Sequence, residues 1–152
     1  ATALIKTMNS ILPKKMQEMN PNIRFKHEKD IELFNYVNPM LYHVADDMAI
    51  WCEENKLPFV ITATVTTKEE DRKLNRISDS HNEKRAIDVS IRGWNKLQMG
   101  LFEGHFCEVY KHIASISKSD GIARMVALHG EGDNLHFHIA LHSKYKVVES
   151  KK

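Results

Sequence analysis

The chain has 152 residues, of which 42% are hydrophobic and 28% are charged, and its formal net charge is +2 with neutral histidines. This length suits one domain over residues 1–152, and the nearly balanced charge excludes a strongly polyanion-binding protein, so we expect no nucleic-acid partner. Apolar runs all fall short of the ~20 residues that a membrane-spanning helix needs, so we also expect no membrane span.

The N-terminal third of the chain predicts helices. Apolar residues between positions 3 and 19 recur every three or four positions, which favours an amphipathic helix interrupted near Pro13. Residues 20–30 are predicted to form a loop. A second helical pattern runs from Asp30 to Asn55, and Pro39 is expected to kink it or divide it. We see no apolar segment followed by a cleavage site, so we expect no secretory signal and synthesis in the cytoplasm.

The middle of the chain alternates between strands and helices. Residues 58–66 are rich in β-branched side chains and predict a strand. A short helix should follow, with Thr66 or Thr67 as its N-cap. Residues 85–94 alternate in polarity as a second strand, and residues 95–117 have the apolar spacing of an amphipathic helix.

The last part of the chain predicts a β-hairpin. Residues 123–130 and 135–142 read as strands on either side of the polar turn "GEGDN". His129, at the end of the first strand, is either an ordinary turn residue or a support for a metal ligand. Together the elements predict an α+β domain whose small, mostly antiparallel sheet has helices packed on one face.

Several side chains with metal-ligand chemistry fall in or beside these strands. His136 and His138 lie two residues apart in one strand, so they point to the same face. Asp88 lies in a strand that is otherwise apolar, and a buried carboxylate is costly unless it is paired or bound to a cation. His81 precedes it in a loop. Such a set of three ligands with one open position is typical of catalytic zinc, whose bound water becomes a nucleophile.

A simpler interpretation of the same residues needs no metal. The two histidines would then be polar residues on a solvated strand face, and backbone donors would satisfy Asp88.

Three segments resemble the LAS metallopeptidases, named for lysostaphin, the D-Ala-D-Ala metallopeptidases and the hedgehog signalling domain. They are "VITATVTTKEEDRKL" (60–74), "SHNEKRAIDV" (80–89) and "HFHIAL" (136–141), and their order is similar to that of the D-Ala-D-Ala branch. The resemblance covers about residues 58–142 and implies a hedgehog-like or D-Ala-D-Ala-peptidase-like fold. Phage endolysins that cut peptidoglycan peptides are the family's small members without a signal sequence, and they are similar to this chain in size.

The resemblance implies that Zn²⁺ is bound by His81, Asp88 and His138, because the second histidine of the family's His-x-His is the ligand. It further implies that His136 polarises water or steadies the tetrahedral intermediate, and that Asp133 is the general base. In the alternative, His136 is the ligand and Asp133 is the acid of an Asp-x-x-His motif, a pattern that also resembles some endolysins.

The chain departs from the family pattern at two positions. Lys84 stands where the family usually has glycine, and Val65 stands where an arginine often contacts the substrate. Substitutes for that contact could come from Arg76, Arg85 and Arg92. Trp94, at the end of its strand, is expected either to line a substrate groove or to pack in the core.

The resemblance therefore implies a zinc-dependent peptidoglycan peptidase, a carboxypeptidase or endopeptidase that uses metal-activated water. Its partners would be the stem peptides of the cell wall, reached after release from the host cell of a phage. The alternative is a non-hydrolytic zinc-binding structural or interaction domain of the same fold, such as a virion component, and the valine at position 65 favours it. The sequence does not fix the oligomeric state.

Overall fold

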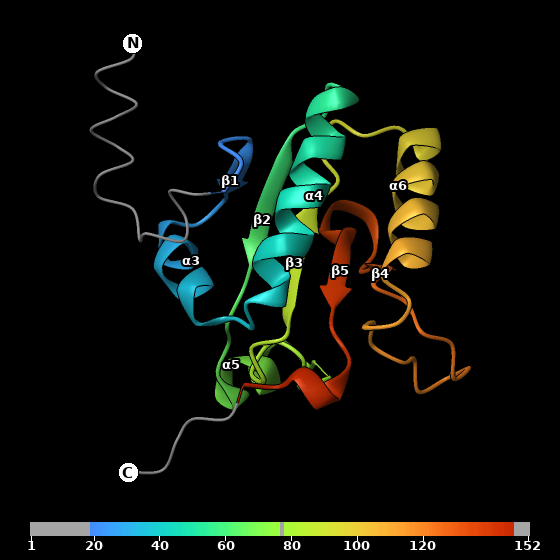
Figure 1. The fold of residues 1–152 in the computed structure, drawn as a ribbon. Helices are drawn as coiled ribbons and strands as arrows, with labels where there is room; N and C mark the ends of the chain where they lie inside the picture. The colour runs from blue at the N-terminus through green and yellow to red at the C-terminus, as the bar shows by residue number, and fades with distance from the viewer. Residues whose placement is uncertain (1–18, 77, 148–152) are drawn as a thin grey trace.

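The computed structural model describes residues 19–76 and 78–147, which include a five-stranded sheet with the strand order β1-β2-β3-β5-β4 (Figure 1). The helix predicted over residues 3–19 lies outside this part of the chain except for its last residue. β1 (Ile23–Phe25) runs parallel to β2 (Phe59–Ala63), and all other neighbouring strands are antiparallel. The predicted α+β class with a mostly antiparallel sheet is confirmed.

β1 corrects one prediction, because residues 20–30 are not a loop throughout. They contain this three-residue strand and the beginning of α3 (Glu28–Leu33). A strand so short has too few positions for alternation to be visible, and it lies beside Pro21, which is typical of turns. The parallel partner β2 supplies its order, with Ile23 opposite Phe59.

The helical pattern from Asp30 to Asn55 is divided, as predicted. α3 passes into a 3₁₀ turn, η1 (Phe34–Tyr36), and α4 (Met40–Glu54) begins directly after Pro39. Pro39 is the N-cap residue of α4, where a missing backbone N–H removes no hydrogen bond from within the helix. α4 turns an apolar stripe toward the sheet, comprising Leu41, Val44, Met48 and Cys52, all fully buried.

α6 (Lys96–Val109) is shorter than predicted. Asn95 caps its start in a capping box with Gln98, but the helix ends at Val109 rather than at residue 117. Residues 110–113 form a turn instead, and beyond it isolated bridges pair Ala114 with Leu141 and Ile116 with Ala123. Ile113 is buried from this turn, so the apolar spacing continues beyond the end of the helix without continuing the helix itself.

Aromatic side chains fill the space between the helices and the sheet. α4 and α6 lie side by side over one face (Figure 1), where Trp51 of α4 packs edge-on against Phe102 of α6. Phe102 in turn stacks on Phe137 of β5 (His136–Ala140), with ring centroids 5.1 Å apart. Because Phe137 points toward the helices, His136 and His138 point to the opposite face.

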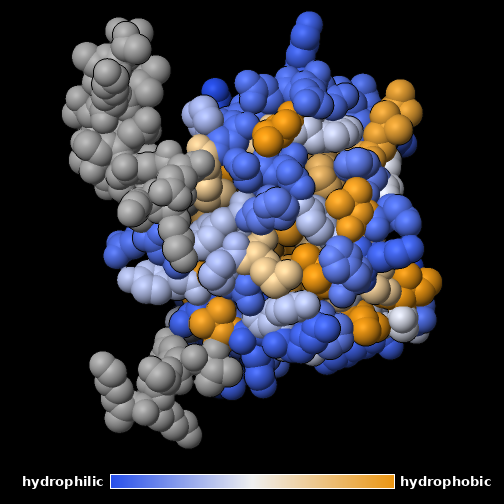
Figure 2. Space-filling view, viewed as in Figure 1, coloured by the Kyte–Doolittle hydropathy of each residue, from blue (hydrophilic) through white to orange (hydrophobic). Residues whose placement is uncertain are grey.

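The outer side of α6 carries exposed apolar side chains. Leu97 and Leu101 are exposed, and Figure 2 shows apolar side chains over the region where α6 lies. Among the described residues, no helix is long and apolar enough to cross a bilayer.

The remaining elements lie near the ends of the central strands. α5 (Lys68–Lys73) begins at Thr67, whose capping box with Glu70 confirms one of the two predicted N-caps. The predicted hairpin is also confirmed: β4 (Val126–His129) and β5 flank a short 3₁₀ turn, η2 (Gly132–Asn134). A further 3₁₀ turn, η3 (Ser143–Tyr145), follows β5.

Candidate metal centre

Strand register places two of the predicted ligands side by side. β3 (Ala86–Ser90) pairs with β5 so that Asp88 lies directly opposite His138, and Ser90 lies opposite His136. Directly opposed residues on one face have adjacent side chains. The Asp88 carboxylate and the His138 ring therefore meet on the sheet face that α4 and α6 leave uncovered.

His81 reaches the same point from the loop between α5 and β3. Its Nδ1 lies 2.6 Å from the carbonyl oxygen of Thr64, and its Nε2 lies 3.0 Å from Oδ1 of Asp88. A carbonyl oxygen only accepts hydrogen bonds, so Nδ1 must carry the proton. The approach of Nε2 to the carboxylate then requires either a second proton on the ring or a cation shared by the two atoms.

The His81 loop is a tight turn closed by backbone hydrogen bonds from Lys84 to His81 and from Arg85 to Ser80. Lys84 adopts φ = +61°, in the left-handed region that favours glycine. This conformation explains physically why glycine suits the position, and it shows that the lysine accepts backbone strain there.

His138 is held at both ring nitrogens. Its Nδ1 lies 2.9 Å from Oδ1 of Asp88, and its Nε2 lies 3.1 Å from the hydroxyl of Ser80, which is itself buried. Burial lowers the pKa of His138, although hydrogen bonding to Asp88 acts in the opposite direction. A lowered pKa keeps the ring neutral, which is the state in which a histidine binds a metal.

Asp88 is buried, and burial alone would raise its pKa. Hydrogen bonds from His138 and His81 outweigh that effect and hold the pKa well below its usual value, so the carboxylate is ionised. Its second oxygen, Oδ2, lies 3.5 Å from the guanidinium of Arg76, which also pairs with Asp71.

These three residues form a group that could hold a metal ion. One ligand atom from each of His81, Asp88 and His138 lies within 4.8 Å of the other two. Two imidazole nitrogens and one carboxylate oxygen are a ligand set that zinc accepts. The carbonyl of Thr64 and the hydroxyl of Ser80 hold the rings from behind, as partners of metal-bound histidines usually do.

The two residues predicted to act on protons lie at different distances from this group. His136 is partly exposed; its Nδ1 lies 2.8 Å from the carbonyl oxygen of Asn134, and its Nε2 lies 3.6 Å from Oδ2 of Asp88. Asp133 is exposed in η2, and its side chain has no hydrogen bond or ion pair within the described part of the chain. Of His136 and Asp133, only His136 therefore lies near the metal-ligand group.

His129 belongs to the same cluster. Its ring stacks on that of His138 with centroids 4.8 Å apart and planes 9° apart. The pairing of β4 with β5 places His129 opposite His136, and partial burial together with that neighbour lowers the pKa of His129. Sequence position alone left a turn residue and a ligand support as alternatives for His129, because the stack depends on strand register.

The three residues predicted to contact substrate lie in different places in the structure. Arg76 lies at the metal-ligand group, beside Asp88. Arg85 is buried, with its guanidinium bound to the carboxylate of Glu83 and the carbonyl of Leu141. Trp94 lies on the opposite face of the sheet, where it packs against Trp51, Phe102 and Phe137. Of its two predicted placements, the core is the one observed.

A cleft of about 490 Å³ begins at this cluster. His129 and His138 line one end, small side chains such as Ala127 and Ala140 line the middle, and His142 lies farther along. The side walls come from the His81 loop and from residues 115–118. Of the three metal-ligand residues, His138 is the one that lines this cleft, so the cleft meets the group at His138.

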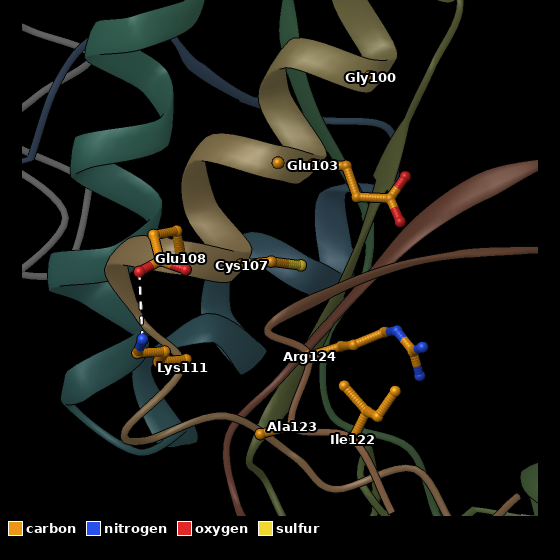
Figure 3. A pocket seen from close by; sticks show the side chains of 9 residues that line it. Gly100, Glu103, Cys107, Glu108, Lys111, Ile122, Ala123 and Arg124 are labelled. Carbon is orange, nitrogen blue, oxygen red and sulfur yellow. Dashed lines mark hydrogen bonds and ion pairs between the residues drawn. The ribbon is translucent and has the colours of Figure 1, made fainter. Parts of the chain in front are cut away.

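A second cavity, of about 540 Å³, lies between α6 and residues 122–124 (Figure 3). Glu103, Cys107 and Arg124 line it, and an ion pair between Lys111 and Glu108 closes one side. None of the three metal-ligand residues lines this cavity, and Arg124 lines both this cavity and the cleft.

Neither a protein-family model nor a curated protein nor a solved structure matches this chain. Comparison therefore supplies no ligand or activity for this site.

Proposed function

We propose that the chain is a zinc-dependent peptidase of the LAS type that hydrolyses peptidoglycan peptides, as phage endolysins do. The observation that carries this proposal is the convergence of His81, Asp88 and His138 within 4.8 Å beside an open cleft. Three protein ligands of this kind leave the fourth tetrahedral position of zinc for water. The order and spacing of the three residues resemble the family's ligand pattern, which adds the substrate class.

Zinc bound here would lower the pKa of its water and polarise the carbonyl of a peptide bond. The chain's own residues would orient the ligands and move protons. His136 is suited to the second task, because its Nδ1 donates to the carbonyl of Asn134 and its Nε2 lies 3.6 Å from Oδ2 of Asp88, at the rim of the metal-ligand group. Asp133, on the neighbouring η2 turn, remains our proposed general base and would have to approach the site when substrate binds.

The substrate would lie in the cleft as an extended peptide. Small side chains at Ala127 and Ala140 leave room for a backbone, and the cleft leads directly to His138. Arg85 lines the same cleft, and Arg76 lies beside Asp88, so these two arginines are the proposed substrate contacts. Trp94 is left out because it packs on the helix side of the sheet. Access to such peptides would follow release from a phage-infected cell.

One observation favours the second candidate, a non-hydrolytic zinc-binding domain. The guanidinium groups of Arg76 and Arg85 already pair with acidic side chains, Arg76 with Asp71 and Asp88, and Arg85 with Glu83. Neither arginine is therefore as available to a substrate carboxylate as an unpaired one at position 65 would be.

Metal analysis together with zymography on purified cell walls tests the proposal. We expect about one zinc per chain, and clearing of the walls that disappears with chelator and returns with zinc. His81→Ala should abolish both, whereas His105→Ala, on the exposed side of α6, should change neither. Zinc retained at full stoichiometry by both His81→Ala and Asp88→Ala would refute the ligand assignment. Zinc without any hydrolysed muropeptide by mass spectrometry would instead support the binding domain.

A further inference from the structure

We propose that Asp30 is a positioning residue for the metal-ligand group. It holds Thr64 in place, and the carbonyl of Thr64 then fixes the ring of His81 so that its Nε2 faces Asp88. The metal-binding part of this inference rests on the proposed zinc site, whereas the positioning of the His81 ring can be tested without metal.

Asp30 is a buried acid that the proposed chemistry does not use. It lies in the first turn of α3 and is 2% exposed. Its Oδ1 accepts a hydrogen bond of 2.6 Å from the hydroxyl of Thr64, and its Oδ2 has no hydrogen-bond partner among the described residues. A buried carboxylate with an unsatisfied oxygen is destabilising. The unfavourable burial of Asp30 is explained if its role is to hold the hydroxyl of Thr64.

Thr64 connects Asp30 to the site through two different groups. Its hydroxyl donates to Asp30, while its backbone carbonyl accepts from Nδ1 of His81 at 2.6 Å. β2 ends one residue earlier, at Ala63, and its pairing with β3 is irregular between Ile61 and Ala63. Because Thr64 lies beyond this irregular pairing, the side-chain bond to Asp30 is the contact that fixes its orientation.

The orientation of this carbonyl decides which nitrogen of His81 faces the metal. With the carbonyl in place, Nδ1 is the donor and Nε2 is directed at Asp88. If Thr64 rotated, the ring could turn or change its tautomer, and the ligand set would lose its geometry. This role requires an acceptor at position 30 but not a charge, so asparagine should replace aspartate there and alanine should not.

The test compares Asp30→Asn, Asp30→Ala and Thr64→Val, each measured for zinc affinity by chelator competition. Asp30→Ala and Thr64→Val should weaken zinc binding about 10-fold, as loss of a partner behind a metal ligand typically does, and Asp30→Asn should stay within about 3-fold. The double variant Asp30→Ala/Thr64→Val should bind no more weakly than either single variant, because the two residues act as one unit.

A second readout needs no metal. In the long-range ¹H–¹⁵N spectrum of the metal-free protein, the His81 ring should show a protected Nδ1–H in the unaltered protein and in Asp30→Asn. This signal should be lost in Asp30→Ala and Thr64→Val. Asp47→Ala is the matched control: it removes a carboxylate that accepts from Tyr110 on the helix side, and it should alter neither readout.

The outcomes separate the two proposals. Unchanged zinc affinity and an unchanged His81 signal in Asp30→Ala and Thr64→Val would overturn the positioning role while leaving the zinc site intact. Equal losses in Asp30→Asn and Asp30→Ala would also overturn it, because charge would then be the cause. If the unaltered chain binds no zinc, the proposed function fails, and the ring signal still decides the role of Asp30. If Asp30→Ala does not fold, comparing Thr64→Val with Asp30→Asn in the same two readouts tests the positioning role in its place.

Discussion

His136 and His138 are the two candidates for the third metal ligand beside His81 and Asp88. They differ in their distance from the Asp88 carboxylate and in their exposure. His138 is opposite Asp88 in the sheet, with Nδ1 2.9 Å from the carboxylate and Nε2 held by Ser80. His136 lies two residue pairs farther along the strands, its Nε2 is 3.6 Å from the other carboxylate oxygen, and it is more exposed than His138. Contact and burial therefore favour His138 as the ligand, and they leave His136 at the rim.

We expect alanine substitutions to separate these two roles. His138→Ala should weaken zinc binding by more than about 100-fold, beyond the range for losing a mere supporting partner. His136→Ala should keep zinc affinity within about 10-fold and lose hydrolysis instead. Chelator competition and muropeptide release measure the two quantities. The reverse order of zinc affinities would assign the metal to His136 and make Asp133 part of an Asp-x-x-His motif.

The backbone of the His81 loop stores strain at Lys84, whose φ is +61°. Left-handed backbone costs about 1–2 kcal/mol for a residue with a Cβ, and glycine avoids this at some cost in chain entropy. Lys84→Gly should therefore raise the free energy of unfolding by about 0.5–1 kcal/mol, measured by urea denaturation. Lys73→Gly, in helix α5, should lower it by a similar amount. A loss of stability in Lys84→Gly would contradict the strain.

At the scale of elements, the sequence predicted best where a pattern is both local and long enough. Alternation identified β3 and β5 together with the shared face of His136 and His138, because a strand has a period of two. The three-residue β1 was missed since its order comes from a parallel partner far along the chain. Likewise, the Asp88–His138 pairing depends on register, which the family resemblance suggested and residue spacing alone could not fix.

The turn between β4 and β5 requires a glycine at position 130. Gly130 has φ = +88°, and a Cβ there would lie 2.3 Å from the backbone oxygen of Asn134. Gly130→Ala should therefore lower the free energy of unfolding by about 2 kcal/mol or more, because backbone strain and a clash with main chain combine. It should also weaken zinc binding, since the hairpin sets the position of His138.

Gly104→Ala is the matched control for this substitution. Gly104 lies inside α6, and a Cβ there would meet nothing within 4 Å. Alanine should raise stability there by about 0.5–1 kcal/mol through helix propensity and leave zinc affinity unchanged. Urea denaturation of both variants checks the pair, and equal effects would show that the turn geometry is unimportant.

At the scale of the whole molecule, the central sheet has two faces with different tasks. Ile87, Val89, Phe137 and Ile139 are fully buried and belong to the core that α4 and α6 cover. Asp88 lies between Ile87 and Val89, and His138 lies between Phe137 and Ile139, so both point to the other face. A substitution at Asp88 or His138 therefore has a buried apolar neighbour on either side along its strand, so folding and metal binding are coupled through these two strands.

Acid should destabilise the metal-free protein. The folded-state pKa values of Asp88 and His138 both lie below their ordinary values of 3.8 and 6.5. The unfolded chain therefore binds more protons than the folded chain. The contribution of these two groups to the free energy of unfolding is fully present above their ordinary pKa values, and it is lost as the pH falls to their folded-state pKa values. Urea midpoints should fall from pH 7 to pH 5.5 as unfolded His138 takes up a proton, and fall further toward pH 4. A midpoint that rises with acidification would contradict this sign.

Zinc should stabilise the whole domain, because its ligands come from a loop and two strands that converge only in the folded chain. A metal that binds the folded state alone adds about 2.7 kcal/mol to the free energy of unfolding at a free concentration of 100 Kd. We expect the thermal midpoint to rise with zinc at pH 7.5 and to return with chelator. The increment should shrink at pH 5.5, where protons compete for the imidazoles. Asp88→Ala should abolish the increment, whereas His105→Ala on α6 should retain it. A zinc-dependent rise that survives in Asp88→Ala would show that the stabilising metal binds elsewhere.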